Sequence, residues 1–131
     1  MTAGALQSPK TKVTALPGDG IGPEVMDATI NILAAAQAPI EWEFAEAGAK
    51  AFERGVVTGV PRETLDSIGA NKLALKSPLE TPIGHGGKSA NVTMRKYFEL
   101  YVNIRPVREL PGIATPFSGR GIDMVIVREN V

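Results

Sequence analysis

A strand-like run, a glycine-rich turn and a helical pattern follow one another near the start of this sequence. Residues 13–16 (VTAL) have strand character, residues 17–24 (PGDGIGPE) form the turn, and Pro23 suits the first position of a helix. Small and apolar side chains then recur at helical spacing, at Val25, Thr29, Ile32 and Ala36. This order constrains the fold to a strand that leads directly into a helix, and we expect that helix to pack on both sides.

Strand and helix patterns alternate through the rest of the chain. Strand character is found in residues 40–44, 72–75, 102–107 and 124–127, and we expect residues 72–75 to form a brief buried strand. Helix character is found in residues 47–54, 61–68 and 91–100, and Gly55 and Gly69 follow the first two segments as expected C-terminal stops. Residues 124–127 (MVIV) are continuously apolar, which is typical of a strand buried on both faces. The alternation predicts an α/β fold.

Composition excludes several classes of protein. Lys plus Arg and Asp plus Glu both number 14, so the net charge is zero, which argues against a nucleic-acid partner. Cysteine is absent, which excludes thiolate metal sites and fits a reducing, cytoplasmic compartment. No apolar run approaches the length of a membrane span, so we expect no membrane partner. Residues 1–11 lack the apolar segment of a secretory signal, and we expect a flexible tail there.

The turn at residues 17–24 invites comparison with dinucleotide-binding loops. Its glycines follow G-x-G-x-G, which does not match the G-x-G-x-x-G fingerprint of a Rossmann fold. A tight connection between strand and helix is therefore favoured over a direct cofactor contact. For Asp19 two roles stay open, contact with a ligand or helix entry. The single histidine, His85, has no catalytic or metal-binding constellation to join.

Residues 76–108 contain the pattern of an anion-binding site. The loop at residues 84–87 is rich in glycine, which lets backbone N–H groups come close to a ligand. Ser89 suits the N-cap of the next helix, and Asn91 and Arg95, four residues apart, lie along one face of it. A helix N-terminus with an arginine one turn inside favours bound anions.

Further cations accompany this helix, namely Lys76, Arg105 and Arg128. A cluster of unpaired cations is costly unless an anion neutralises it, and guanidinium groups pair bidentately with carboxylates. Spacing and residue type therefore predict a site for a small polycarboxylate or phosphate.

Five segments, in this order, resemble the decarboxylating isocitrate dehydrogenases of the isocitrate/isopropylmalate dehydrogenase family. They are PGDGIGPE at residues 17–24, LETP at 79–82, KSANVTMRK at 88–96, NIRPVRE at 103–109 and IVRENV at 126–131. The resemblance implies that residues 12–131 form the N-terminal portion of that family's α/β/α fold, which has a mixed sheet and is not a Rossmann fold. The S-x-N-x-x-x-R pattern is its most specific part.

The resemblance also implies roles for individual residues. Ser89 and Asn91 would contact the substrate, while Arg95, Arg105 and Arg128 would clamp its carboxylates. Lys76 would lie at the edge of that pocket. Thr81 and Glu80 would lie near the nicotinamide of NAD or NADP.

The activity implied is oxidative decarboxylation of isocitrate to 2-oxoglutarate, a step of the tricarboxylic acid cycle, assisted by Mg²⁺ or Mn²⁺. The catalytic tyrosine, the lysine of the partner subunit and the metal-binding aspartates of the family would follow Val131. We therefore expect no catalytic or metal-ligating residue within the chain, a fragment that is inactive alone, and a homodimer in the complete protein. Ser77 departs from the glycine usual before Pro78 in the family.

Two alternatives stay open. The first is a relative that oxidises homoisocitrate, isopropylmalate or tartrate. The second is a non-catalytic, regulatory subunit of a heteromeric dehydrogenase that keeps the anion site for control.

Overall fold

The computed structural model describes residues 9–80 and 89–130, which form two compact units. The first unit extends to Met94 and the second begins at Arg95. Residues 1–8 of the expected tail, together with His85 and its glycine-rich loop, lie outside the described residues.

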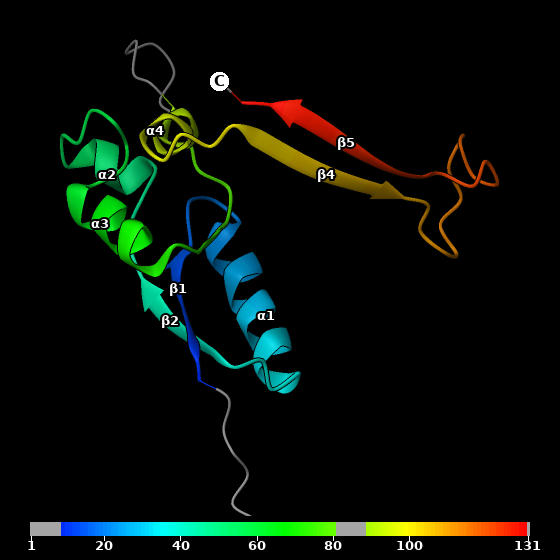
Figure 1. The fold of residues 1–131 in the computed structure, drawn as a ribbon, viewed down its shortest axis with the longest axis horizontal. Helices are drawn as coiled ribbons and strands as arrows, with labels where there is room; N and C mark the ends of the chain where they lie inside the picture. The colour runs from blue at the N-terminus through cyan, green and yellow to red at the C-terminus, as the bar shows by residue number, and fades with distance from the viewer. Residues whose placement is uncertain (1–8, 81–88, 131) are drawn as a thin grey trace, which may run out of the picture. The chain divides into compact units, whose positions relative to one another are not determined.

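A parallel sheet forms the centre of the first unit. Strand β1 (Thr11–Leu16) lies between β2 (Ile40–Phe44) and β3 (Ala74–Lys76), in the order β2-β1-β3. The residues from Val13 to Leu16 are buried because β1 has a strand on each edge and helices over its faces. Figure 1 shows α1 (Gly22–Ala35) on one side of the sheet and α2 (Ala49–Glu53) with α3 (Arg62–Asn71) on the other. The prediction of an α/β fold is confirmed.

The second unit contains an antiparallel ribbon. Strands β4 (Val102–Arg108) and β5 (Asp123–Glu129) pair along their whole length, from Val102 opposite Glu129 to Arg108 opposite Asp123. The connection between them is rich in Pro and Gly, and Figure 1 shows it as an irregular loop at one end of the ribbon. Helix α4 (Ala90–Tyr97) contains the boundary between the two units.

Most segment boundaries agree with the sequence pattern, but three burial predictions are wrong. Helix α1 buries only Gly22 and Met26, and Ile32 on its other side is 68% exposed. Strand β3 lies at the edge of its sheet and is not buried. In β5, Val127 is 66% exposed. Periodicity identifies which side chains share a face, whereas burial requires an element to cover that face, and the described residues supply none here.

Gly69 was expected to follow the end of α3 but lies inside it. The helix continues to Asn71 and ends at Lys72, which adopts the left-handed conformation (φ 60°) and donates its N–H to the Ile68 carbonyl at 2.8 Å. A glycine inside a helix costs about 1 kcal/mol relative to alanine. Asn71, two residues further on, forms hydrogen bonds to the sheet that hold this end of the helix.

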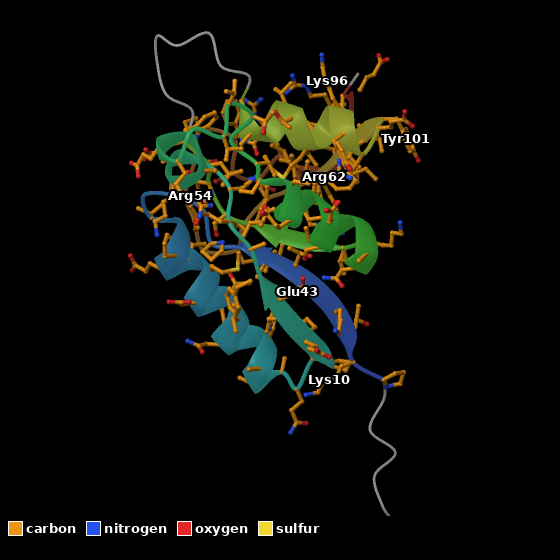
Figure 2. All side chains as sticks on the ribbon, turned by 90° about the vertical axis from the view of Figure 1, so that its left-hand side faces the viewer. Lys10, Glu43, Arg54, Arg62, Lys96 and Tyr101 are labelled. Carbon is orange, nitrogen blue, oxygen red and sulfur yellow. The ribbon has the colours of Figure 1, made fainter. Side chains whose placement is uncertain are left out.

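Those contacts form a polar network between α3 and the sheet. The Asn71 amide Nδ2 donates to Thr14 Oγ1 at 2.9 Å and to Glu43 Oε2 at 3.1 Å. Thr14, which is fully buried, also shares a hydrogen bond of 2.8 Å with the Ser67 hydroxyl. Figure 2 labels Glu43 on β2, next to α3. Hydrogen bonds from Ser67 and then Asn71, with a smaller contribution from the charge of Lys12, lower the pKa of the Glu43 carboxyl.

Because the pKa of Glu43 is lower in the folded state, its ionised form stabilises the fold. That contribution is present above the ordinary pKa of a glutamate, about 4.3, and is lost as the pH falls through the lower folded value. We expect Glu43→Gln to flatten the fall in the free energy of unfolding as pH drops below about 4.5. Urea unfolding at a series of pH values measures this. The exposed Glu53, replaced by Gln, is the matched control, and equal slopes for both variants would contradict the prediction.

Candidate functional site

Two turns that are far apart in the sequence are hydrogen-bonded side by side at the carboxyl ends of β1 and β3. Ser77 donates its N–H to the Leu16 carbonyl at 3.0 Å, and Asp19 donates its N–H to the Pro78 carbonyl at 2.9 Å. We call residues 16–22 the first turn and residues 77–80 the second turn. Ligands of open α/β sheets bind beyond the carboxyl ends of the strands, which is the place where these turns lie.

The Asp19 side chain joins the two turns to a helix. Its Oδ2 accepts the N–H of Glu80 at 2.7 Å and the N–H of Ala49, the first residue of α2, at 3.0 Å. The side chain is buried, with the residue 9% exposed. The Asp19 main-chain carbonyl accepts the N–H of Gly22, the first residue of α1, at 2.8 Å, which is the helix-entry role that the sequence left open. Its side chain, by contrast, reaches a helix and a turn that come later in the chain.

Two glycines allow this close approach. Gly18 has φ +73°, and a Cβ there would lie 2.1 Å from the Pro78 carbonyl oxygen. A Cβ on Gly22 would lie 2.3 Å from the Pro17 carbonyl oxygen and 3.2 Å from Ser77 Cβ. Ser77, the departure from the family pattern, is buried and fits against Gly22. The glycines of the first turn therefore serve backbone packing, which agrees with the tight connection predicted for it.

Lys76 lies at the end of β3, directly before the second turn. It is exposed, and its Nζ donates to the carbonyl oxygen of the adjacent Ser77 at 2.9 Å. A hollow of about 360 Å³ opens beside it between α1 and β3, bordered by Met26 and Thr29 on the helix side. The structure thus places a cation at a cavity edge in the first unit.

Helix α4 presents the next group of predicted site residues. The Ser89 carbonyl accepts the N–H of Thr93 at 2.9 Å, which is the position of an N-cap. Ala90 and Met94 are buried, one turn apart, and Asn91 and Arg95 follow each of them by one residue. Asn91 and Arg95 therefore share the neighbouring face and are half-buried.

The register of the ribbon determines on which face each of its three arginines lies. Arg128 lies opposite Asn103, and Arg105 lies two residues further along β4, so Arg105 and Arg128 are diagonal neighbours on one face. Arg108, an odd number of residues from Arg105, lies on the other face, where its Nε contacts Asp123 Oδ1 at 3.0 Å. Among the described residues, neither Arg105 nor Arg128 forms an ion pair. One face of the ribbon therefore carries two guanidinium groups that form no ion pair within the described residues.

Asn103 is a residue that the sequence reasoning missed. Its Oδ1 accepts the Nε–H of Arg105 at 3.3 Å, and it lies directly opposite Arg128. The contact leaves the two terminal nitrogens of Arg105 to pair with a carboxylate. The signal was present in the NIRPVR segment, because residues two apart on a strand share a face.

The structure brings together two of the predicted residues, Arg105 and Arg128, in the ribbon, and two more, Asn91 and Arg95, on α4. Lys76 and Glu80 belong to the first unit, and Thr81 lies outside the described residues. In residues 9–80 and 89–130 no three His, Cys, Asp or Glu side chains gather as a metal site. None of the helices in these residues has the length and apolarity needed to cross a bilayer.

Comparison with known proteins identifies the class to which this fold and site belong. The sequence model of the isocitrate/isopropylmalate dehydrogenases matches residues 12–131. The chain belongs to this family.

Particular members of the family are similar over most of the chain. The NADP isocitrate dehydrogenase of Thermus thermophilus is 57% identical over 96% of the chain, and a regulatory subunit of the NAD enzyme of Dictyostelium discoideum is 44% identical over 91%. A crystal structure of a Thermus thermophilus protein matches with a TM-score of 0.90 and 58% identity over 93% of the chain and 25% of its own. For the isocitrate dehydrogenase of Methylococcus capsulatus the TM-score is 0.83, with 43% identity over 91% of the chain and 34% of its own. The chain spans 25% of the Thermus relative and 31% of the Dictyostelium relative.

The contact between the two turns predicts a large cost for a side chain at Gly18. Gly55 is a matched control because it also has a positive φ (+85°) but would place its Cβ in open space. We expect Gly55→Ala to cost about 1–2 kcal/mol of backbone strain. Gly18→Ala should cost a further ~1–3 kcal/mol, because the added methyl group overlaps the Pro78 carbonyl. Urea unfolding of both variants measures the difference, and equal losses would mean that the turns are not in contact.

Proposed function

We propose that the protein to which this sequence belongs catalyses NAD- or NADP-dependent oxidative decarboxylation of isocitrate. The observation that supports this most directly is the face of the ribbon that carries Arg105 and Arg128 without an ion-pair partner in the described residues. Isocitrate carries three carboxylates, so an anion of this kind suits two guanidinium groups and the further arginine on α4. The names of the relatives include both NAD and NADP enzymes, so the choice of nicotinamide stays open.

In this proposal the described residues bind and orient the substrate. Arg105 and Arg128 hold carboxylates from the ribbon, with Asn103 directing the Arg105 guanidinium. Arg95, Asn91 and Ser89 supply the contacts of α4. A bound nicotinamide would supply the acceptor for the hydride of the hydroxyl-bearing carbon, with the hydroxyl proton released at the same step. The oxidised acid would then lose carbon dioxide and take up a proton at that carbon to give 2-oxoglutarate. Holding the substrate in one orientation favours the reaction because the entropy cost of aligning the reacting groups is met when the substrate binds.

Other parts of the proposal concern groups beyond these residues. We propose that Mg²⁺ or Mn²⁺ is held by other residues of the complete protein. We propose accordingly that residues 1–131 alone are inactive, and that the active protein is a cytoplasmic homodimer.

A regulatory subunit is the second candidate function. The Dictyostelium relative with this name is 44% identical to the chain. A subunit of that kind would use the same arginines to sense an acid without turning it over.

One set of assays distinguishes these functions. The purified protein is supplied with isocitrate, homoisocitrate, isopropylmalate or tartrate, with NAD or NADP and with Mg²⁺ or Mn²⁺, and reduced nicotinamide is followed by absorbance. Preference for isocitrate supports the proposal, and preference for another acid contradicts it. Isocitrate binding without turnover in the presence of both metals and both cofactors supports the regulatory subunit.

Because Arg105 and Arg128 lie on one face of the ribbon and Arg108 on the other, their alanine variants should differ in kcat/KM for isocitrate. We expect Arg105→Ala and Arg128→Ala each to lower kcat/KM for isocitrate about 10- to 100-fold, because a hydrogen bond to a charged group contributes about 1.5–3 kcal/mol. Arg108→Ala is the matched control: it removes the same side chain from the opposite face, where Asp123 already pairs with it. We expect it to stay within about 3-fold of the wild type, since exposed ion pairs contribute only ~0–1 kcal/mol. Equal losses for Arg105 and Arg108 would contradict the assignment of faces.

A further inference from the structure

One oxygen of the Asp19 carboxylate has both of its lone pairs engaged by the backbone. Oδ2 accepts the N–H groups of Ala49 and Glu80, which lie 30 and 61 residues further along the chain. A carboxylate oxygen offers two lone pairs, so this atom has no acceptor capacity left for a ligand. Its surroundings are tight as well, because a Cβ on Gly48 would lie 2.0 Å from the same atom. The geometry describes an anchor for two peptide groups.

Glu80 is the residue whose position depends most on this anchor. The preceding residues of the second turn are held by backbone bonds, from Asp19 N–H to the Pro78 carbonyl and from Ser77 N–H to the Leu16 carbonyl. The Glu80 N–H, by contrast, is held by the Asp19 side chain alone, and its bond of 2.7 Å is the shorter of the two that Oδ2 accepts. Glu80 Oε1 in turn lies 3.4 Å from where a Cβ on Gly20 would be. Backbone and side chain of Glu80 thus both lie against the first turn.

We propose that Asp19 is a positioning residue for the cofactor side of the dehydrogenase site. It sets the place of the Glu80 peptide group and hence of the Glu80 side chain, for which a position near the nicotinamide is expected. The same oxygen holds the start of α2, so the helix and the second turn keep a fixed distance from each other. The inference deepens the proposed function and rests on it. It differs from a ligand role for Asp19, because here Oδ2 acts by accepting two peptide N–H groups of the chain itself.

The first test measures the anchor itself and does not depend on any activity. Hydrogen exchange resolved at single amides should show the Glu80 and Ala49 amides of the wild-type protein protected at least tenfold. In Asp19→Ala both should lose protection together, while the Ser77 amide, bonded to the Leu16 carbonyl, stays protected. An unprotected Glu80 amide in the wild type would overturn the proposal, and this measurement needs no variant to fold.

The second test measures the consequence for the reaction, through the KM values for cofactor and isocitrate. We expect Asp19→Ala to raise the KM for the nicotinamide cofactor about 10-fold or more and to leave the KM for isocitrate within about 3-fold. In Asp19→Asn the amide oxygen can take the place of Oδ2 and accept both N–H groups. That variant should therefore keep both KM values within about 3-fold of the wild type.

Thr64→Val is the matched control for a general loss of stability. Thr64 is 3% exposed, and its hydroxyl donates to the Glu46 carbonyl at 2.7 Å, so the variant also removes a buried hydrogen bond between side chain and backbone in the first unit. We expect a lower Tm with no change in the cofactor KM relative to the isocitrate KM.

The outcomes separate the two proposals. A cofactor KM that rises as much in Thr64→Val as in Asp19→Ala would overturn the positioning role, and so would an Asp19→Asn variant as poor as the alanine variant. If the wild-type protein turned over no isocitrate, the proposed function would fail and the cofactor role of Asp19 would fail with it. The hydrogen-exchange result would still decide whether Asp19 anchors Glu80.

Discussion

The contact between the two turns is the constraint on which the rest of the first unit depends. Strand β3 is short, and what keeps the chain beside β1 after it ends is the sequence of bonds from Ser77 to Glu80. These bonds bring the backbones of the two turns closer together than a side chain at residue 18 would permit. A glycine therefore occupies that position, where a Cβ would lie 2.1 Å from the Pro78 carbonyl oxygen. They also bring a buried carboxylate to a place where two N–H groups would otherwise lack partners. Leaving such a group unsatisfied costs about 1–3 kcal/mol, so the turn, the helix and the carboxylate stabilise one another.

The sequence predicted the positions of the helices and strands well, but it predicted their burial and long-range contacts poorly. Asp19 shows why. Local pattern is enough to predict a turn at residues 17–24, because glycine and proline act on the residues next to them. The partners of Asp19 lie 30 and 61 residues away, and no local pattern contains them. The errors at Gly69 and in β5 have the same origin. Helix α3 continues past Gly69 to Asn71, whose side chain bonds to the sheet, and an apolar strand stays exposed because no described element covers it.

The candidate site also contains some features that local sequence predicts and others that it does not. Spacing and residue type predicted an anion site that included Arg105 and Arg128, and the resemblance gave both the role of carboxylate clamps. The strand register adds that both lie on one face of the ribbon, while Arg108 pairs with Asp123 on the other. The contact between Asn103 and Arg105 was not predicted, because an uncharged asparagine gives no signal in a pattern of cations. In the structure its Oδ1 lies 3.3 Å from Arg105 Nε.

The proposed reaction therefore combines a backbone contact that forms without a ligand and exposed side chains that a bound substrate would order. The Glu80 peptide is fixed in advance by a buried carboxylate, so its geometry needs no ligand to define it. The guanidinium groups of Arg105 and Arg128 are exposed, and a single hydrogen bond orients one of them. Holding a long side chain in one rotamer costs up to about 2 kcal/mol, and here the bound carboxylates must supply it. In the proposed function, the cofactor side is therefore ordered by the fold, and the substrate side is ordered by the anion that it binds.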